Sequence, residues 1–383
     1  MDSLTQIVLG AACGEVALGK KIGNKAMLWG AIGGTIPDLD VFVRNWIYDD
    51  AIHREAFHRG FMHSILFAVL MSILLAIYFK TLHPYVSYYI RKMWFWIKKS
   101  FVYVYNKIFN KNIVLEIPIR KDYPSFKDWW WLWFLSIFTH PILDCFTAYG
   151  TQLFAPFSNY RVAFNNIAVV DPLYTLPFLL FLILAMFFKR TSQVRKTLVW
   201  MGIGISSAYM LFTVFNKFYV DDVFEKNLKE QNIPYERFTS TPTLFNNILW
   251  WGTAETEDAF YMGEYSIFDS QPISFIRLEK NHQLLGKYDD TEEMQIMKWF
   301  TFGYYTLQEL EKDKYRLNYI KYGLRENDGK QVPVFGFDLM VDNGKISMLE
   351  YDPEDDMTEG GQKSFWEAIK KELGRLWTRM QGN

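Results

Sequence analysis

The chain has 383 residues, a formal net charge of −1 and an aromatic content of 18%. This length is enough for two domains, and a charge close to zero gives no indication of nucleic-acid binding. The two cysteines, Cys13 and Cys145, both lie in apolar stretches, which argues against a disulfide framework. Two cysteines are also too few for a thiolate zinc site, so a metal would take His and carboxylate ligands.

The first 218 residues contain six apolar segments that predict transmembrane helices. In chain order, these segments are Leu4–Gly19, Ile22–Pro37, Phe61–Phe79, Trp129–Tyr149, Leu173–Phe188 and Leu198–Phe218. The first two are short and rich in glycine, which predicts close helix packing. The fourth opens with WWWLW, as expected of aromatic residues at a membrane interface. The alternative is a soluble helical core.

Basic residues predict how this bundle is oriented. They are concentrated in the connections Lys20–Lys25, Lys80–Lys127 and Lys189–Lys196. Cytoplasmic connections carry an excess of Lys and Arg, so these three are expected on the inside of a bacterial inner membrane and both termini on the outside. Residues 84–110 mix aromatic residues with Lys and predict an amphipathic helix on the inner surface.

Residues 219–383 differ from the membrane part because polar and apolar residues alternate there. They predict a soluble α+β domain on the outer side. The expected strands are Thr243–Trp251, Phe260–Phe268, Ile273–Leu278, Tyr315–Tyr322, Val332–Met340 and Ile346–Tyr351, with helices at Thr291–Phe302 and Phe365–Met380. Asp342-Asn343-Gly344 predicts a hairpin, and Ser364 with Glu367 a capping box. The expected fold is thus an all-α membrane bundle of about six spans, residues 1–218, followed by this domain, residues 219–383.

One pair of polar residues lies inside an apolar segment. His140 and Asp144 are four residues apart in HPILD, so both side chains face one side of a helix. A carboxylate inside a membrane segment usually has a partner and a function. The pair indicates half of a divalent-metal site. The alternative is a buried hydrogen bond that only joins helices.

Two further motifs carry metal-ligand types. Asp38 and Asp40 follow Pro37 in PDLD, and His58 and His63 flank the bend that Gly60 permits. Carboxylates in an extended turn can converge on one cation, and the two imidazoles can face one site. Solvated acids at a helix end and an ordinary interfacial histidine are the alternatives.

The predicted topology puts all three motifs at the outer ends of helices. Together they offer a set of six candidate ligands, namely Asp38, Asp40, His58, His63, His140 and Asp144. A mixed nitrogen and oxygen set suits zinc, and also manganese or iron. Six ligands are enough for one ion or for two ions that share a bridging carboxylate.

Further polar residues on the same side extend the candidate site. Arg59 lies next to His58, and Arg161 follows in PFSNYR. Both can balance the charge of a phosphate group. Asp171, in the pair DP, is a further candidate ligand or a partner of one. A salt bridge between Arg161 and Asp171 is the alternative.

Several motifs taken together resemble a known family. MDSLTQ, PDLD, HRGFMHS, HPILDCFTAYGT and PFSNYR followed by DP are similar to the YdjM-type family of membrane-bound, metal-dependent hydrolases, over about residues 1–190. That family is distantly similar to zinc-dependent phospholipase C and P1-type nucleases. The resemblance implies an all-helical site with the six ligands named above. Gln6 stands where some relatives have His, and Met62 stands where Thr is expected.

The expected function is hydrolysis of a phosphoester, such as a lipid or polyprenyl phosphate, at the outer face of the membrane. A divalent metal, zinc before others, would activate water, and Asp38 or Asp40 would accept its proton. Arg59 and Arg161 complete the expected catalytic set. The second hypothesis is a membrane scaffold with a structural metal site. Transport is a third, but the last two apolar segments carry almost no ionisable residues.

Overall fold

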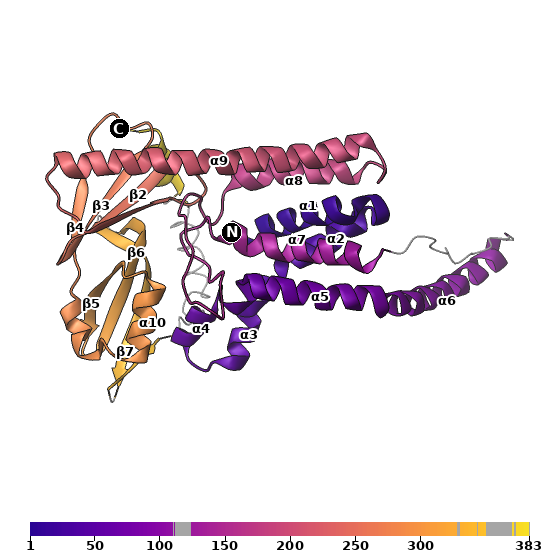
Figure 1. Cartoon of the computed structure of the whole chain (residues 1–383), viewed down its shortest axis with the longest axis horizontal. Coiled ribbons are helices and arrows are strands. Elements are labelled where there is room, and N and C mark those ends of the chain that lie inside the picture. The colour runs from indigo at the N-terminus through magenta and orange to yellow at the C-terminus, as the bar shows by residue number, and fades with distance from the viewer. Residues whose placement is uncertain are drawn as a thin grey trace.

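The computed structural model describes residues 1–109, 111, 124–327, 330–342, 344–349, 370 and 373–382. An N-terminal helical region is followed by a C-terminal domain that contains two β-sheets (Figure 1). The architecture of a helical part followed by a mixed α and β part is the one that the sequence predicts.

The six apolar segments lie mostly in helices, but the fourth, predicted to reach Tyr149, leaves its helix after Asp144. The helical region consists of α1 (Ser3–Ile22), α2 (Asn24–Thr35), η1 (Pro37–Leu39), α3 (Asp40–Ile47), α4 (Ala51–Phe57), η2 (Phe61–His63), α5 (Ile65–Thr81), α6 (His83–Phe109), α7 (Phe126–Asp144), α8 (Pro172–Met186) and α9 (Gln193–Glu230). Among them, α1 packs against α2, α5 against α7, and α8 against α9.

Short polar side chains set where these helices begin. Asp2 accepts a hydrogen bond from Thr5 N at the start of α1, and Ser64 accepts one from Phe67 N at the start of α5. Ser125 and Asp128 form a capping box on α7, and Asp171 caps α8. Each cap supplies an acceptor for backbone N–H groups that have no partner within the helix.

Two of the predicted spans have a sharp bend at one end. Residues 24–35 and 37–47 form helices that meet at an angle of 44°, and residues 51–63 and 65–81 meet at 59°. Among the described residues, α9 is long and apolar enough to cross a membrane, and each bent pair would add a span if it crosses as one unit. Length and composition therefore support one to three spans, and the six-span count stays a prediction.

Close packing between α1 and α2 confirms the role expected of the N-terminal glycines. Gly14 faces Ala26 and Gly30 on α2, and a Cβ atom at Gly14 would lie 2.9 Å from the Gly30 Cα atom. Gly10 faces Gly30 and Gly34 in the same way. Small residues thus bring the two backbones together and hold α2 in place, and with it η1.

Replacing Gly14 by leucine should therefore destabilise the helical region. Overpacking of this kind costs about 1–3 kcal/mol, and here the obstacle is backbone that cannot rotate away. Thermal unfolding in detergent measures the effect. Gly204→Leu on α9 is the matched control, because no atom lies within 4 Å of a Cβ placed there. Equal melting temperatures for the two variants would refute the packing argument.

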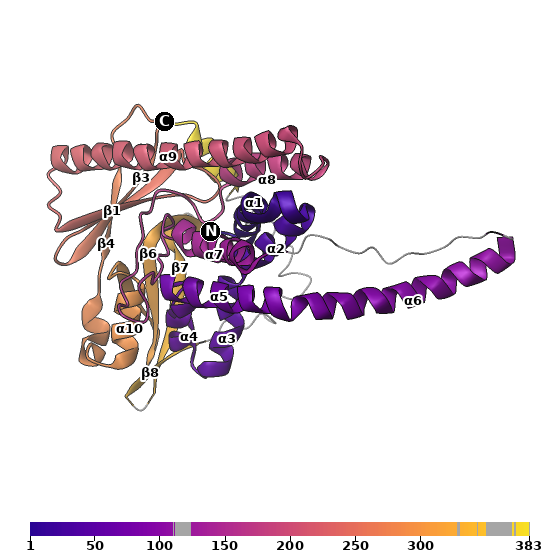
Figure 2. The same ribbon diagram turned by 45° about the vertical axis from the view of Figure 1, so that its right-hand side comes forward.

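The basic connections gather at one end of the helical region. The Lys21 Nζ atom lies 2.5 Å from Asp128, Arg190 donates to the Lys21 carbonyl, and Asn24 donates to the Met186 carbonyl. From this end α6 projects away from the rest of the structure (Figure 2). A helix is thus confirmed for residues 84–109, with most of its side chains exposed. The opposite end of the bundle faces the sheet domain (Figure 1).

The sheet domain consists of two four-stranded antiparallel sheets. Their strands are β1 (Arg237–Pro242), β2 (Leu249–Glu255), β3 (Ala259–Ser266) and β4 (Phe275–Glu279), followed by β5 (Tyr305–Glu311), β6 (Lys314–Asn327), β7 (Lys330–Asp342) and β8 (Lys345–Met348). Between them lie η3 (His282–Tyr288) and α10 (Glu292–Phe300). Asp342 pairs with Lys345, which confirms the predicted hairpin.

Two strands were not expected from the sequence. β1 and β5 are short and partly polar, and Thr243–Trp251 predicted a strand too early, because β2 begins at Leu249. Residues 373–380 are helical, in agreement with the predicted C-terminal helix. The predicted capping box at Ser364 and Glu367 lies outside the described residues.

Helix α9 joins the two parts of the chain. It runs along α8 and then along the first sheet (Figure 1). The helix ends at Glu230, so the domain boundary predicted at residue 218 falls inside it. Phe224 of α9 packs in a buried cluster with Trp250 and Tyr265. The segment between α7 and α8 also contacts the sheet domain, since Asn247 donates to the Asn166 carbonyl. The sheet domain is therefore held over the end of the bundle where the three polar motifs lie.

Candidate metal centre

Three segments that are distant in sequence meet at this end of the bundle. The break after α2 places Asp38 in η1 and Asp40 at the start of α3. The break before α5 places His63 at the end of η2, and α7 ends with His140 and Asp144 on one face. Both breaks have a local cause: Pro37 opens η1, and Arg59 in the left-handed backbone region precedes η2.

Asp38, His63 and His140 direct one ligand atom each toward a common point. The two Nε2 atoms are 3.2 Å apart, and Asp38 Oδ1 lies 3.5 Å from His63 Nε2 and 3.3 Å from His140 Nε2. Nitrogen and oxygen ligands about 2.0–2.2 Å from a tetrahedral zinc ion are separated by about 3.3–3.6 Å. The three separations thus have the size of the edges of a zinc coordination polyhedron.

The far side of each imidazole ring is also held. His140 Nδ1 donates to the Gly34 carbonyl oxygen at 2.6 Å, and His63 Nδ1 lies 3.2 Å from Asp40 Oδ2. A carbonyl oxygen can only accept, so the proton of a neutral His140 sits on Nδ1 and the Nε2 lone pair faces the centre. Metal-binding histidines are commonly oriented in this way by a carbonyl or a carboxylate.

Asp40 is buried and uses both of its oxygen atoms on neighbouring protein groups. Its Oδ1 atom lies 3.0 Å from His58 Nδ1, and its Oδ2 atom accepts from Arg59 N at 2.9 Å. Asp40 and His58 therefore stand behind His63, outside the group of three that faces the common point. Both were predicted as ligands, and the contacts suit them to orienting His63.

Asp144 supplies a fourth oxygen next to the two imidazoles. Its Oδ1 atom accepts from Gln6 Nε2 at 3.0 Å and from the Met1 amine. Its Oδ2 atom lies 3.5 Å from His63 Nε2 and 3.4 Å from His140 Nε2, is fully buried and has no hydrogen-bond partner among the described residues. The Arg59 guanidinium lies 3.3 Å from this oxygen without forming a hydrogen bond to it, and a bound metal ion would supply the direct contact that the oxygen lacks.

These donors fit a divalent metal ion. With both imidazoles neutral and protonated on Nδ1, two nitrogen lone pairs face one another at 3.2 Å, next to oxygens of two carboxylates. A cation between the atoms, either a proton or a metal ion, removes this repulsion, and the spacing of the donors suits a metal ion. In the part of the chain that the structure describes, this is the one group of at least three His, Cys or acidic residues with metal-ligand spacing.

The two predicted arginines occupy different places. Arg59 is buried in the site, with Nε 3.3 Å from Asp144 Oδ2 and Nη1 donating to Thr147 Oγ1 at 3.0 Å. Arg161 lies on the other side of Tyr149, whose ring stacks against both guanidinium groups. Arg161 donates to the carbonyls of Tyr149 and Phe300 and so joins the loop to the sheet domain.

Asp171 lies apart from the centre. It caps α8 through Leu173 N and Tyr174 N, and its other oxygen accepts from Tyr209. No ion pair between Asp171 and Arg161 occurs among the described residues. In the sequence, the position of Asp171 directly before Pro172 is as typical of a helix cap as of a metal ligand.

Some contacts of the centre have no signature in the sequence. The Gly34 carbonyl that orients His140 is a backbone group, and Gln6 reaches Asp144 across 138 positions. Gln6 was noted in the sequence only through its alignment with histidine in relatives. The contact shows that position 6 lies beside the centre.

One comparison with known proteins covers the helical region. A family model described as YdjM inner membrane protein matches residues 1–220. The uncharacterized protein YfhP of Bacillus subtilis is 27% identical over 180 residues, which is 45% of this chain and 42% of YfhP. The chain thus aligns with less than half the length of that relative. No solved structure matches.

Proposed function

Since the chain belongs to the YdjM inner membrane protein family, we propose that it is a membrane-bound, metal-dependent hydrolase that cleaves a phosphoester. One observation supports this most: the lone pairs of His63 and His140 and the oxygens of Asp38 and Asp144 face a common point. The group His/His/Asp with an adjacent carboxylate is of the type that catalytic zinc sites use.

The chain's own residues account for binding and proton transfer in this proposal. Asp38, His63 and His140 would hold the ion, and a bound divalent metal supplies a water of lowered pKa and polarises a phosphoryl oxygen. Asp144 Oδ2 faces the same point, 3.4 Å from His140 Nε2 and 3.3 Å from Arg59 Nε, and can accept a proton there. Arg59 places a positive charge beside the carboxylate, where a phosphate oxygen would develop negative charge.

The surroundings of Asp38 favour a lipid-linked substrate. The Asp38 side chain is 29% exposed, so the centre is reached from its side. The adjacent helix α3 exposes Phe42, Trp46 and Ile47, with Trp46 85% exposed. A short helix with exposed aromatic and aliphatic side chains fits a bilayer interface. A lipid or polyprenyl phosphate would reach the centre along this surface.

Removing the metal should abolish hydrolysis without unfolding the protein. Purified protein in detergent would be treated with EDTA, and the cleavage of bis(p-nitrophenyl) phosphate would be followed at 405 nm before and after zinc or manganese is added back. We expect loss of activity on chelation and recovery with one of these metals. Cleavage that persists in EDTA would reject a metal-dependent mechanism.

A scaffold with a structural metal site is the second candidate. It is favoured by the burial of His63, His140 and Asp144, since closed sites are typical of structural zinc. The same experiment separates the two proposals. A protein that binds metal, melts at a lower temperature in EDTA and cleaves no phosphoester or lipid phosphate would be a scaffold.

The proposed orientation places the centre and the sheet domain outside the cytoplasm, because the basic connections lie at the opposite end. Alkaline phosphatase fused after Asn383 should be active, since the enzyme folds only outside the cytoplasm. A fusion truncated after Thr191, in a basic connection, should be inactive and is the matched control. The reverse pattern of activity would invert the topology.

A further inference from the structure

A cavity of about 490 Å³ lies between the loop that follows α7 and the sheet domain. Its walls come from residues 159–165, from β1, from the end of α10 and from Lys321 of β6. A volume of this size is in the range that binds a small ligand. It is separate from the metal centre, because none of Asp38, His63 and His140 is among its lining residues.

The cavity has an excess of positive charge. Arg161, Arg237, Lys298 and Lys321 line it, and no acidic residue is among its lining residues. Arg237 pairs with Glu255, and Lys298 pairs with Asp289 at 3.0 Å. Arg161 and Lys321 form no ion pair with a carboxylate in the described part of the chain. Two of the four cations therefore lack a protein counter-charge.

Those two cations are deeply buried around one aromatic ring. Lys321 is 3% exposed and Arg161 is 5% exposed. The Lys321 Nζ atom lies 3.9 Å and the Arg161 Cζ atom 4.7 Å from the centre of the Phe302 ring. Carbonyl oxygens satisfy part of their hydrogen bonding: Lys321 donates to Ala148, and Arg161 donates to Tyr149 and Phe300.

Burial of two unpaired cations is unfavourable in the absence of a ligand. The pKa of Lys321 reflects this cost: burial lowers it well below the usual range, and the charges of Arg161, Lys217 and Arg237 lower it further. An anion in the cavity would offset the repulsion and would keep Lys321 protonated.

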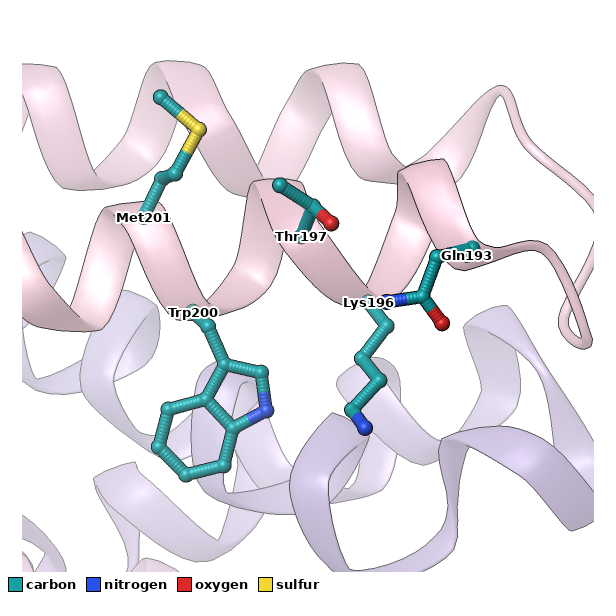
Figure 3. A pocket seen from close by; sticks show the side chains of 5 residues that line it. All are labelled: Gln193, Lys196, Thr197, Trp200 and Met201. Atoms are coloured by element: carbon teal, nitrogen blue, oxygen red, sulfur yellow. The ribbon is translucent and has the colours of Figure 1, made fainter.

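We propose that this basic cavity binds a phosphate-bearing anion. Arginine and lysine are the side chains that recognise phosphate, through planar paired hydrogen bonds and through a point charge respectively. Aromatic residues such as Trp299 and Tyr304 offer an apolar wall for the organic part of such a ligand. The hollow on α9 in Figure 3 lacks these features, since one helix lines it and Lys196 is its single cation.

The proposal is tested by titrating the full-length protein in detergent with four probes. These are inorganic phosphate, pyrophosphate, glycerol 1-phosphate and dihexanoyl phosphatidic acid. EDTA is present throughout, so that phosphate held by a metal ion elsewhere does not contribute. At least one probe should bind saturably by calorimetry. Lys321→Met, which keeps the shape of the side chain but removes its charge, should weaken that binding about 10- to 100-fold, as expected for loss of a charge-assisted hydrogen bond.

Arg237→Gln provides a second variant. The Arg237 side chain is 45% exposed, so its replacement should disturb folding less than replacement of the buried Lys321. It should also weaken binding. Arg277→Gln, an exposed arginine on β4 outside the cavity, is the matched control and should leave the affinity unchanged. Tighter binding of dihexanoyl phosphatidic acid than of glycerol 1-phosphate would assign a lipid headgroup, and equal affinity a soluble phosphate. No saturable binding, or an affinity unchanged in both cavity variants, would overturn the proposal.

Discussion

His140→Ala is expected to abolish metal binding and phosphoester hydrolysis together. The variant removes one of the three atoms that face the common point and leaves His63 Nε2 and Asp38 Oδ1 without their shared partner. Loss of a group that merely orients a metal ligand costs about 10- to 100-fold in affinity, so loss of a ligand itself should cost more. Elemental analysis of purified protein, together with phosphodiesterase activity, measures both effects.

Two further variants calibrate this result. His53→Ala changes a histidine that pairs with Asp50 and lies outside the group of three, so metal content should match that of the unmodified chain. Asp40→Asn weakens the support of His63 and should lower metal affinity by about 10- to 100-fold without abolishing binding. Metal retained at full occupancy in His140→Ala would remove His140 from the centre.

Arg195→Ala is expected to give the largest loss of stability in the helical region. Arg195 is buried and binds both oxygens of Glu15, with Nε–Oε1 and Nη2–Oε2 distances of 2.6 Å, and Nη1 donates to Asn24. Removing one partner of a buried pair leaves an uncompensated charge and costs about 3–5 kcal/mol. Unfolding in mixed detergent and SDS micelles measures the change in free energy.

A double variant and a control make this test specific. Replacing both partners, in Glu15→Gln with Arg195→Met, should recover part of the loss, because no lone charge stays buried. Lys226→Ala removes an exposed pair with Asp222 on the same helix and should leave unfolding unchanged. If Arg195→Ala unfolds like the unmodified chain, the pair does not hold α1 to α9.

Most helices of the N-terminal region follow from the sequence, because the apolar runs indicate where the helices lie and the caps are local. Ser64 and Ser125 begin α5 and α7 at the points where polar residues give way to apolar ones. The bends at Pro37 and Gly60 were expected as turns. Hydropathy did not indicate that a further short helix continues beyond each bend, α3 after Pro37 and α4 before Gly60.

The metal centre could be predicted in its composition but not in the roles of its members. Histidine and aspartate at helix ends indicated Asp38, His63 and His140 as ligands, and these three converge. Asp40 and His58 carry the same residue types, yet their distance from the common point depends on the backbone of Arg59. Whether an Asp binds a metal or orients a histidine is set by a shift of a few ångströms.

The pairing of distant residues was beyond prediction from one sequence. Glu15 lies inside an apolar helix, and its partner Arg195 lies 180 positions away in a connection that the sequence marks only as basic. Likewise, Lys321 lies in a strand of a domain without recognisable motifs. Its contact with Ala148 arises only because the sheet domain docks on the loop after α7.

X-ray absorption at the zinc edge of the zinc-loaded, full-length protein tests the metal centre most directly. We expect one bound ion per chain with nitrogen and oxygen ligands only, at about 2.0–2.2 Å, and the outer-shell scattering of two imidazole rings. In His140→Ala, the two-ring signal should be lost. Sulfur in the coordination sphere, scattering from fewer than two imidazoles, or a protein that retains no zinc after removal of excess metal would contradict the assignment of Asp38, His63 and His140.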